Sequence, residues 1–491
     1  MQTTPKIYER KLHEIWLSQD FSNPLETLSG EEIVILDTGI LNEDTAGPDF
    51  KNARIRIGNL VYIGDIEIDS DYNNWKSHGH NIDNKHNKVI LHASLTNKNN
   101  QHYVYTKDGR RVPTICLSRF IDKTDLHEFE TSFKGEDENS QLKCSHLSDT
   151  VDFHLKKRFI SELGMQRYQK KCEKVYNRLK ELAYIKELHL KEPVIGYDLK
   201  PEFENKKFEP EAFHDKEIWQ QLFYELVFEA LGYSKNKNIM LRLAQSVNIT
   251  FLSKLGTINE SLSFYESALF NISGILPEKS KFDNIQIPEY INKLYTDWEI
   301  IKRVYDGQTF YNADWHFFKL RPQNFPTIRI AGGVKFLESL LFEDLLNIIS
   351  KKFSEIRNLN VLINSIRSLF VIKGKGFWKT HYVFEQTSKD EIKYFVGAAR
   401  ADEIVVNVVL PFFSVYFDLF NEPELRKKIL KIYNIYDQRS ENKIVKEVAD
   451  GLNTTNFLKK TVLTQGMLEL FRNYCSKKKC LECEIGKIIF N

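Results

Sequence analysis

Residues 47–69 read GPDFKNARIRIGNLVYIGDIEID and decide how the N-terminal part of the chain is expected to fold. The two halves of this stretch alternate between apolar and polar residues, and Gly58-Asn59 between them is a pair typical of tight turns. We therefore expect a β-hairpin. It would return the end of its second strand towards the start of the first and so bring Glu67 near Asp49.

Three carboxylates occupy every second position of the second strand of this hairpin. Because alternate residues of a strand point to the same face, Asp65, Glu67 and Asp69 should project together. Like charges placed this way repel each other. The arrangement is tolerable if the face is solvated or if a cation lies among the carboxylates, and both interpretations stay open at this point.

Further strands and one helix are expected around the hairpin. Residues 6–19 have one apolar side and predict an amphipathic helix. Four more segments have the composition of strands, namely residues 32–37, 88–95, 101–106 and 111–117. We expect an α+β or α/β domain over residues 1–132, with a mixed β-sheet, and an acidic linker over residues 133–146.

From residue 147 to residue 491 the apolar residues recur mainly with a helical period, so a large, mostly α-helical region is expected. The helices are predicted near residues 150–190, 216–232, 235–256, 260–275, 284–306, 333–357 and 416–434. Residues 378–396 give a weaker strand signal. The apolar run at 404–413 fits either a buried strand or a helix.

Composition narrows the class of protein. The chain has 491 residues, 42% of them hydrophobic, and 69 Lys and Arg balance 67 Asp and Glu, so overall charge favours no particular partner. The first residues lack the apolar core of a signal peptide, and no apolar run of about 20 residues occurs. We therefore expect a cytoplasmic protein without a membrane partner.

Asp49 and Glu67 form the first candidate site. Two carboxylates with open coordination positions suit a hard divalent cation such as Mg²⁺ or Mn²⁺, which could activate water for phosphoryl chemistry. Asp69, and alternatively Asp65, would supply an auxiliary carboxylate. The competing interpretation is a solvated strand face and an Asp in a Gly-Pro turn.

Histidines gather directly after the hairpin. Five of the 13 histidines of the chain fall within residues 78–102, and His78, His80 and His92 are candidates for a metal ligand or a catalytic base. Zn²⁺ is a second possible ion, although no standard zinc-binding spacing is present. A buried, hydrogen-bonded structural role is the alternative for each histidine.

Three cysteines near the C-terminus have the spacing C-x4-C-x2-C. Cys475, Cys480 and Cys483 predict a zinc site or an iron–sulfur cluster, and the six cysteines of so long a chain do not indicate a disulfide framework. A fourth ligand would have to come from elsewhere. The candidates are Cys144, Cys172, Cys116 and His146. Reduced thiols without a metal are the alternative.

Residues 156–187 carry ten Lys and Arg against four Glu, with tyrosines between them. Such a helix could follow the phosphates of DNA or RNA, and its tyrosines could stack on bases. The candidate phosphate contacts are Lys170, Lys171, Lys174 and Arg178. A solvated helix face is the alternative.

Several motifs in a fixed order resemble a bacterial family, found largely in Bacteroidetes and defined only as a domain of unknown function. They are GPDFKNARI, GDIEI, W-x-x-HGH-x-x-D, VILH, LGYSKNK, ESALFNISGIL, LRPQNFPTIRIA, VVNVVLP and YCSKKKCLECEIG. The resemblance covers nearly the whole chain and implies no activity.

The N-terminal part also resembles the PD-(D/E)XK, or restriction-endonuclease-like, nucleases in its order of elements. Pro48-Asp49 is similar to the PD element, Glu67 to the acidic residue of the next strand, and Asp69 stands where those nucleases have a lysine. The resemblance implies a metal-dependent nuclease in which a histidine replaces the lysine. The alternative is a catalytically inactive nuclease-like scaffold that binds nucleic acid or serves in assembly.

Overall fold

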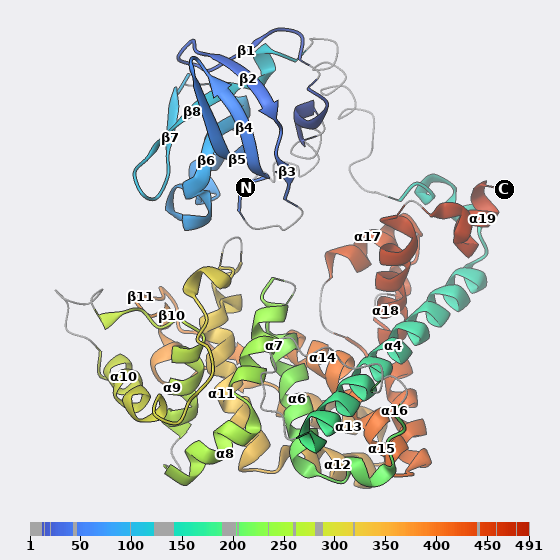
Figure 1. Ribbon diagram of the computed structural model, residues 1–491. Coiled ribbons are helices and arrows are strands. Elements are labelled where there is room, and N and C mark those ends of the chain that lie inside the picture. The colour runs from blue at the N-terminus through green and yellow to red at the C-terminus, as the bar shows by residue number, and fades with distance from the viewer. Residues whose placement is uncertain are drawn as a thin grey trace. The chain divides into compact units, whose positions relative to one another are not determined.

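The computed structural model divides into two compact units, which Figure 1 shows in blue and from teal to red. Unit 1 comprises Met1–Glu138 with His316–Leu320, and unit 2 comprises the rest. The structure describes residues 12–13, 15–19, 21–42, 47–98, 100–121, 142–188, 203, 206–233, 235–258, 262–279, 288–317, 320–438, 442–457, 459–477 and 479–490. The division falls within the predicted linker 133–146, whose first nine residues lie outside the described part, as does the start of the predicted helix 6–19.

Unit 1 is built on a mixed sheet, as the sequence predicts. Its strands are β1 (Leu25–Glu26), β2 (Glu32–Asp37), β3 (Ile40–Leu41), β4 (Phe50–Ile57), β5 (Leu60–Asp71), β6 (Val89–Thr96), β7 (Tyr103–Tyr105) and β8 (Arg111–Cys116). They run in the order β1-β2-β4-β5-β6-β8-β7, with β3 paired to β4. The β4–β5 hairpin turns at Gly58-Asn59, with Ile57 opposite Leu60.

The middle of β5 is buried on both faces. Ile66 and Ile68 belong to the apolar core, where Trp16 and Phe50 also pack. Glu67 and Asp69 alternate with these isoleucines and point to the other face. They are also buried, with Glu67 5% and Asp69 1% exposed. The solvated-face interpretation is therefore wrong for this strand.

The connection from β5 to β6 positions the functional groups. Because β5 and β6 are parallel, the chain must cross over between them. It does so through three single turns, α2 (Asn74–Ser77), η1 (His80–Ile82) and η2 (Asn84–Lys88). Gly64 lets the two strands meet closely, since a Cβ there would lie 2.5 Å from the Lys88 carbonyl oxygen.

Unit 2 is predominantly helical, as expected. Its α-helices are α4 (Phe153–Glu187), α6 (Lys216–Leu231), α7 (Lys237–Ser246), α8 (Ile249–Ile258), α9 (Leu262–Ile272), α10 (Glu289–Ile301), α11 (Pro326–Leu341), α12 (Leu345–Glu355), α13 (Leu359–Leu369), α14 (Ala398–Ile404), α15 (Leu410–Leu419), α16 (Pro423–Ile435), α17 (Lys443–Gly451), α18 (Thr461–Leu470) and α19 (Glu484–Phe490). Of the described helices, none has the length and apolar character to cross a membrane.

The longest helix, α4, crosses α18 at two glycines. A Cβ on Gly164 would lie 2.0 Å from the Val462 carbonyl oxygen, and one on Gly466 would lie 1.8 Å from the Ile160 carbonyl oxygen. The two backbones can therefore touch only because both positions lack a side chain. Figure 1 shows α4 running beside α18, and this contact joins the start of the unit to a helix near its end.

The structure decides one alternative that the sequence left open and corrects one predicted helix. Residues 404–413, which fitted a strand or a helix, are helical, with a π-helical stretch at Val405–Val409. The helix predicted at 333–357 is two helices, α11 and α12, and α11 begins earlier, at Pro326. Proline is tolerated in the first helical turn, where its missing N–H costs no hydrogen bond.

Candidate metal centre

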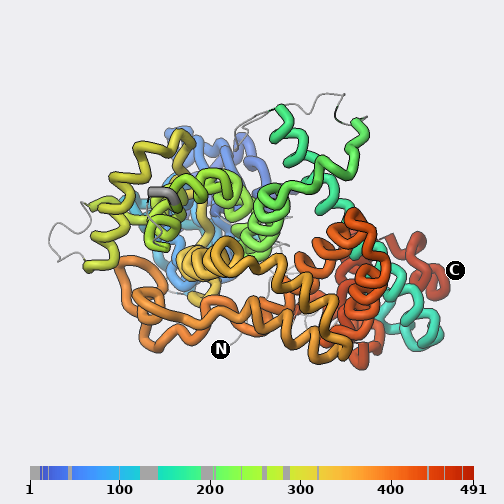
Figure 2. Tube along the Cα trace, turned by 90° about the horizontal axis from the view of Figure 1, so that it is seen from below, coloured from blue at the N-terminus to red at the C-terminus, as the bar shows by residue number. Residues whose placement is uncertain are grey.

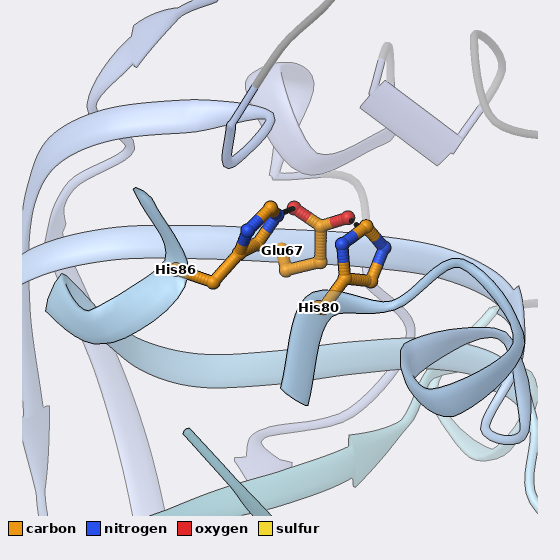
Figure 3. A group of neighbouring side chains, drawn as sticks. All are labelled: Glu67, His80 and His86. Atoms are coloured by element: carbon orange, nitrogen blue, oxygen red, sulfur yellow. Dashed lines mark ion pairs between the residues drawn. The ribbon is translucent and has the colours of Figure 1, made fainter. Parts of the chain in front are cut away.

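Glu67 lies at the centre of a buried group of acidic and imidazole side chains in unit 1. Its Oε1 is 2.9 Å from His80 Nε2, and its Oε2 is 3.6 Å from His86 Nε2. Figure 3 shows the carboxylate between the two rings, which come from the η1 and η2 turns. The ligand atoms of these three residues all lie within 4.8 Å of one another, a geometry suited to one metal ion.

Asp69 forms a second set two residues further along β5. Its Oδ1 is 3.3 Å from His78 Nδ1 and its Oδ2 is 4.0 Å from His80 Nε2. These three residues also place their ligand atoms within 4.8 Å of one another, so the two sets share His80. His92, on the neighbouring strand, lies 3.1 Å from Asp69 Oδ2 and orients that carboxylate.

Gly79 sets the backbone conformation of the HGH sequence. Gly79 has φ +80°, a conformation that glycine adopts without the steric cost of a side chain. This turn separates α2 from η1 and presents both His78 and His80 to Asp69. Trp75, on α2, closes the site, with its ring centroid 5.5 Å from that of His80 and 5.2 Å from that of His92.

Burial and neighbouring charges shift the pKa values of several groups in the cluster. Burial would raise the pKa of Glu67, but the charge and hydrogen bonding of His80, together with His86, lower it to about 2. Burial would lower the pKa of His86, but Asp83 and Glu67 raise it to about 9. The pKa of Asp69 is also lowered, against burial, by His78 and His92. The raised pKa of His86 thus places a positive charge beside the ionised Glu67.

Several buried atoms of the cluster lack a hydrogen bond of normal geometry within the described residues. They are Glu67 Oε2, both ring nitrogens of His86, and His92 Nδ1. Leaving a buried polar atom without a partner is costly, and a cation ligated by Glu67 Oε2 and by His86 Nε2, after loss of its proton, would give these two atoms a partner. The residues present therefore fit a metal ion, and the mixture of imidazole and carboxylate suits Mn²⁺ or Zn²⁺.

Asp49 lies beside the cluster but outside both ligand sets. Its Oδ2 accepts a hydrogen bond from the Ile68 backbone N–H at 2.8 Å, and its Oδ1 is 3.3 Å from His13 Nε2. Burial and the charge of Glu67 raise its pKa to about 7. The hairpin thus brings Asp49 towards Glu67, as predicted. Asp65 instead accepts a hydrogen bond from the Asn52 N–H at the bulge of β4.

Two residues of the site were missed by sequence reasoning. His86 belongs to the same histidine-rich segment, and extending the candidate set over the whole β5–β6 connection would have included it. His13 lies on the opening helix, far from the site in sequence. No local pattern distinguishes it, because only the packing of that helix brings it to Asp49.

The side chains of α4 that were predicted to contact nucleic acid form ion pairs and hydrogen bonds within unit 2. Lys170 Nζ is 2.5 Å from Glu469 Oε1, Lys174 Nζ is 2.5 Å from Glu229 Oε1, and Arg178 Nε donates to Glu225 Oε2 at 2.8 Å. Lys171 donates to Gln465 Oε1 at 2.8 Å and to Asn407, and burial lowers its pKa well below the usual range. Contact of these side chains with DNA or RNA stays a prediction.

The family described as Protein of unknown function (DUF2851) matches residues 9–189 and 203–442. The chain belongs to this family. The matched residues include both ligand sets and Cys144 but end before the three C-terminal cysteines. No curated protein and no solved structure matches the chain, so the resemblance to nucleases gains no support from these comparisons.

Proposed function

We propose that unit 1 carries a divalent metal centre that hydrolyses phosphodiester bonds of DNA or RNA. The observation that supports this most is the pair of overlapping ligand sets around Glu67 and Asp69, with His80 in common. Because the same nitrogen, His80 Nε2, faces both carboxylates and can ligate only one ion, the two sets support a single ion held by His80 and one or both carboxylates. A metal ion can activate water and stabilise the charge of phosphodiester cleavage.

The bound ion would supply an activated water and stabilise negative charge on the phosphate. Glu67, Asp69, His78, His80 and His86 are the proposed ligands. Asp49, at the edge of the cluster, is assigned an auxiliary role in binding the ion or the water. Because Asp69 stands where the nuclease lysine is expected, the metal and its imidazole ligands would have to perform the task of that lysine.

A non-catalytic scaffold that binds nucleic acid or serves in assembly is the second candidate. Its support is the burial of the ligands. His78 is the most exposed of the five, with 23% of its side chain accessible, while those of His80 and His86 are 4% and 1% accessible. A closed metal site suits a structural role, whereas a catalytic ion keeps one position open to substrate.

Metal analysis combined with a cleavage assay tests the proposal. The purified protein should contain manganese or zinc, or take it up on addition, and then cleave single- or double-stranded DNA or RNA. Glu67→Gln and His80→Asn should lose the metal and the cleavage together. His102→Asn is the matched control, because His102 is an exposed histidine of the same segment outside the cluster.

The outcomes separate the two candidates. Metal binding that depends on Glu67, without cleavage of any nucleic acid, would support the scaffold and reject the enzyme. A wild-type protein that binds no divalent ion would reject the metal centre itself. Circular dichroism of each variant verifies that the fold is intact.

A further inference from the structure

Four cysteines lie on neighbouring elements at the two ends of unit 2. Cys144 directly precedes the η4 turn (Ser145–Thr150). Cys475 ends the π-helical turn η12 (Phe471–Cys475), Cys480 begins the η13 turn (Cys480–Glu482), and Cys483 precedes α19. Cys144 is thus a candidate for the fourth cysteine that the C-x4-C-x2-C spacing lacks.

The packing of these elements brings the two ends together. The η4 turn packs against α19, η12 packs against η13, and η13 packs against α19. In both Figure 1 and Figure 2 the start of unit 2, in teal, lies beside the C-terminal segment, in red. An ion pair between Arg158 of α4 and Glu484 of α19, at 3.4 Å, joins the same two ends.

Burial and neighbouring thiols raise the pKa of two of these cysteines. Burial, followed by the neighbouring Cys483 and Cys480, raises the pKa of Cys144 to about 11. Burial, followed by Cys144, Cys483 and Cys480, raises the pKa of Cys475 to about 12. All four cysteines are free of disulfides. Four thiols gathered on neighbouring elements can ligate a metal ion as thiolates.

The other two cysteines lie elsewhere. The Cys116 thiol lies in unit 1 and donates to the Leu95 carbonyl oxygen, and Cys172 lies within α4 beside Tyr168. The structure therefore sets Cys116 and Cys172 apart from Cys144, whereas the fourth candidate, His146, is exposed in the η4 turn two residues after Cys144. Cys116 and Cys172 become natural controls.

The turn between Cys480 and Cys483 has the features of a metal-binding loop. The Cys483 N–H donates to the Cys480 carbonyl oxygen at 3.2 Å. Burial raises the pKa of the Cys483 thiol, whereas hydrogen bonds from the backbone amides of Gly486 and Ile485 lower it. Gly486 permits this approach, since a Cβ there would lie 2.1 Å from the Cys480 carbonyl oxygen.

We propose that Cys144, Cys475, Cys480 and Cys483 bind one structural metal centre through four thiolates and so join the start of unit 2 to its C-terminal end. Four thiolates hold either a zinc ion or an iron–sulfur cluster. On binding, each thiol releases its proton to solvent and its sulfur ligates the metal. The centre is separate from the histidine and carboxylate cluster of unit 1.

Metal content and spectroscopy test this site. The protein, purified anaerobically without chelator, should retain zinc, or iron with inorganic sulfide and a visible charge-transfer absorption. Either metal supports the site, and the absorption distinguishes the two. The measurement is repeated in the Glu67→Gln variant, so that metal bound by the histidine and carboxylate cluster of unit 1 is not counted. Cys144→Ser and Cys480→Ser should each lose this metal, while Cys116→Ser and Cys172→Ser should keep it.

A second measurement avoids the risk that a variant fails to fold. The wild-type protein is alkylated with iodoacetamide with and without chelator, and labelling of each cysteine is read by mass spectrometry. The chelator should increase labelling of the four proposed ligands and leave Cys116 and Cys172 unchanged. Absence of both zinc and iron, equal labelling with and without chelator, or full metal retention in Cys144→Ser would overturn the proposal.

Discussion

At the scale of single residues, the candidate site of unit 1 depends on one backbone conformation. Gly79 holds φ +80° between the two histidines of the HGH sequence. A side chain at this position disfavours the left-handed conformation by about 1 kcal/mol. A modest strain there therefore acts directly on the directions of His78 and His80.

We predict that Gly79→Ala lowers metal retention by unit 1 with a loss of stability of only about 1 kcal/mol. Gly109→Ala is the matched control, because Gly109 has φ +81°, has open space around it, and lies in the β7–β8 turn. Both variants should lose similar stability by denaturant unfolding, but only the first should lose metal. Equal metal content in the two variants would show that metal binding does not depend on the HGH turn.

At the scale of elements, the close packing of α4 against α18 depends on the two glycines where these helices cross. Gly466→Ala would place a methyl group against the backbone of α4, 1.8 Å from a carbonyl oxygen that cannot move alone. We expect a destabilisation of at least ~2 kcal/mol, the range typical of overpacked cores. Thermal and urea unfolding measure it.

The control for that experiment is Gly256→Ala, on α8. A Cβ there meets only the Tyr265 hydroxyl, at 3.4 Å, so this substitution should be neutral or stabilising, because alanine favours a helix over glycine. If Gly466→Ala were as stable as Gly256→Ala, the close contact between α4 and α18 would not exist in solution.

An acid-sensitive contact joins the same two helices. Glu469 of α18 is 2.5 Å from Lys170 Nζ and 3.1 Å from Arg167 Nη1, both on α4. Burial would raise the pKa of Glu469, but these two cations and Asn473 lower it below its usual value. The ionised form therefore stabilises the folded state above the ordinary glutamate pKa of about 4.3, and this contribution is lost as the pH falls below it.

We predict that Glu469→Gln is less stable than wild type at pH 7 and that the difference shrinks as the pH falls from about 5 to about 3. Urea unfolding at a series of pH values measures it. Glu162→Gln, on the exposed side of α4 with 53% of its side chain accessible, is the control and should change little at any pH. If the difference in stability between Glu469→Gln and wild type did not depend on pH, the ionised contact would not be its cause.

At the scale of the whole molecule, the two units are expected to unfold in separate steps. A chain of two compact units is not a two-state system, and a ligand stabilises the unit that binds it. In calorimetry, Mn²⁺ or Zn²⁺ should raise the midpoint temperature of one unfolding transition, and Glu67→Gln should abolish this rise. Cys480→Ser should lower the midpoint temperature of the other transition. Both variants acting on the same transition would contradict two independent centres.

The sequence alone determined the local features of this protein. Alternating residues and the Gly58-Asn59 turn predicted the β4–β5 hairpin, and the spacing of Glu67 and Asp69 placed both carboxylates on one face. These features depend on a period of two residues and on turn chemistry, both of which are local. The helical period likewise identified unit 2 as mostly helical.

Only the tertiary structure decided which groups meet. Parallel pairing of β5 with β6 placed His92 on Asp69, and the connection between these strands added His86 to Glu67. The packing of η4 against α19 brought the chain next to Cys144 to the C-terminal segment, which is why Cys144 is the proposed fourth ligand. The basic residues of α4 met acidic or amide partners from other helices for the same reason. Such contacts join segments distant in sequence, so they follow from the packing of whole elements and leave no periodic signal in the chain.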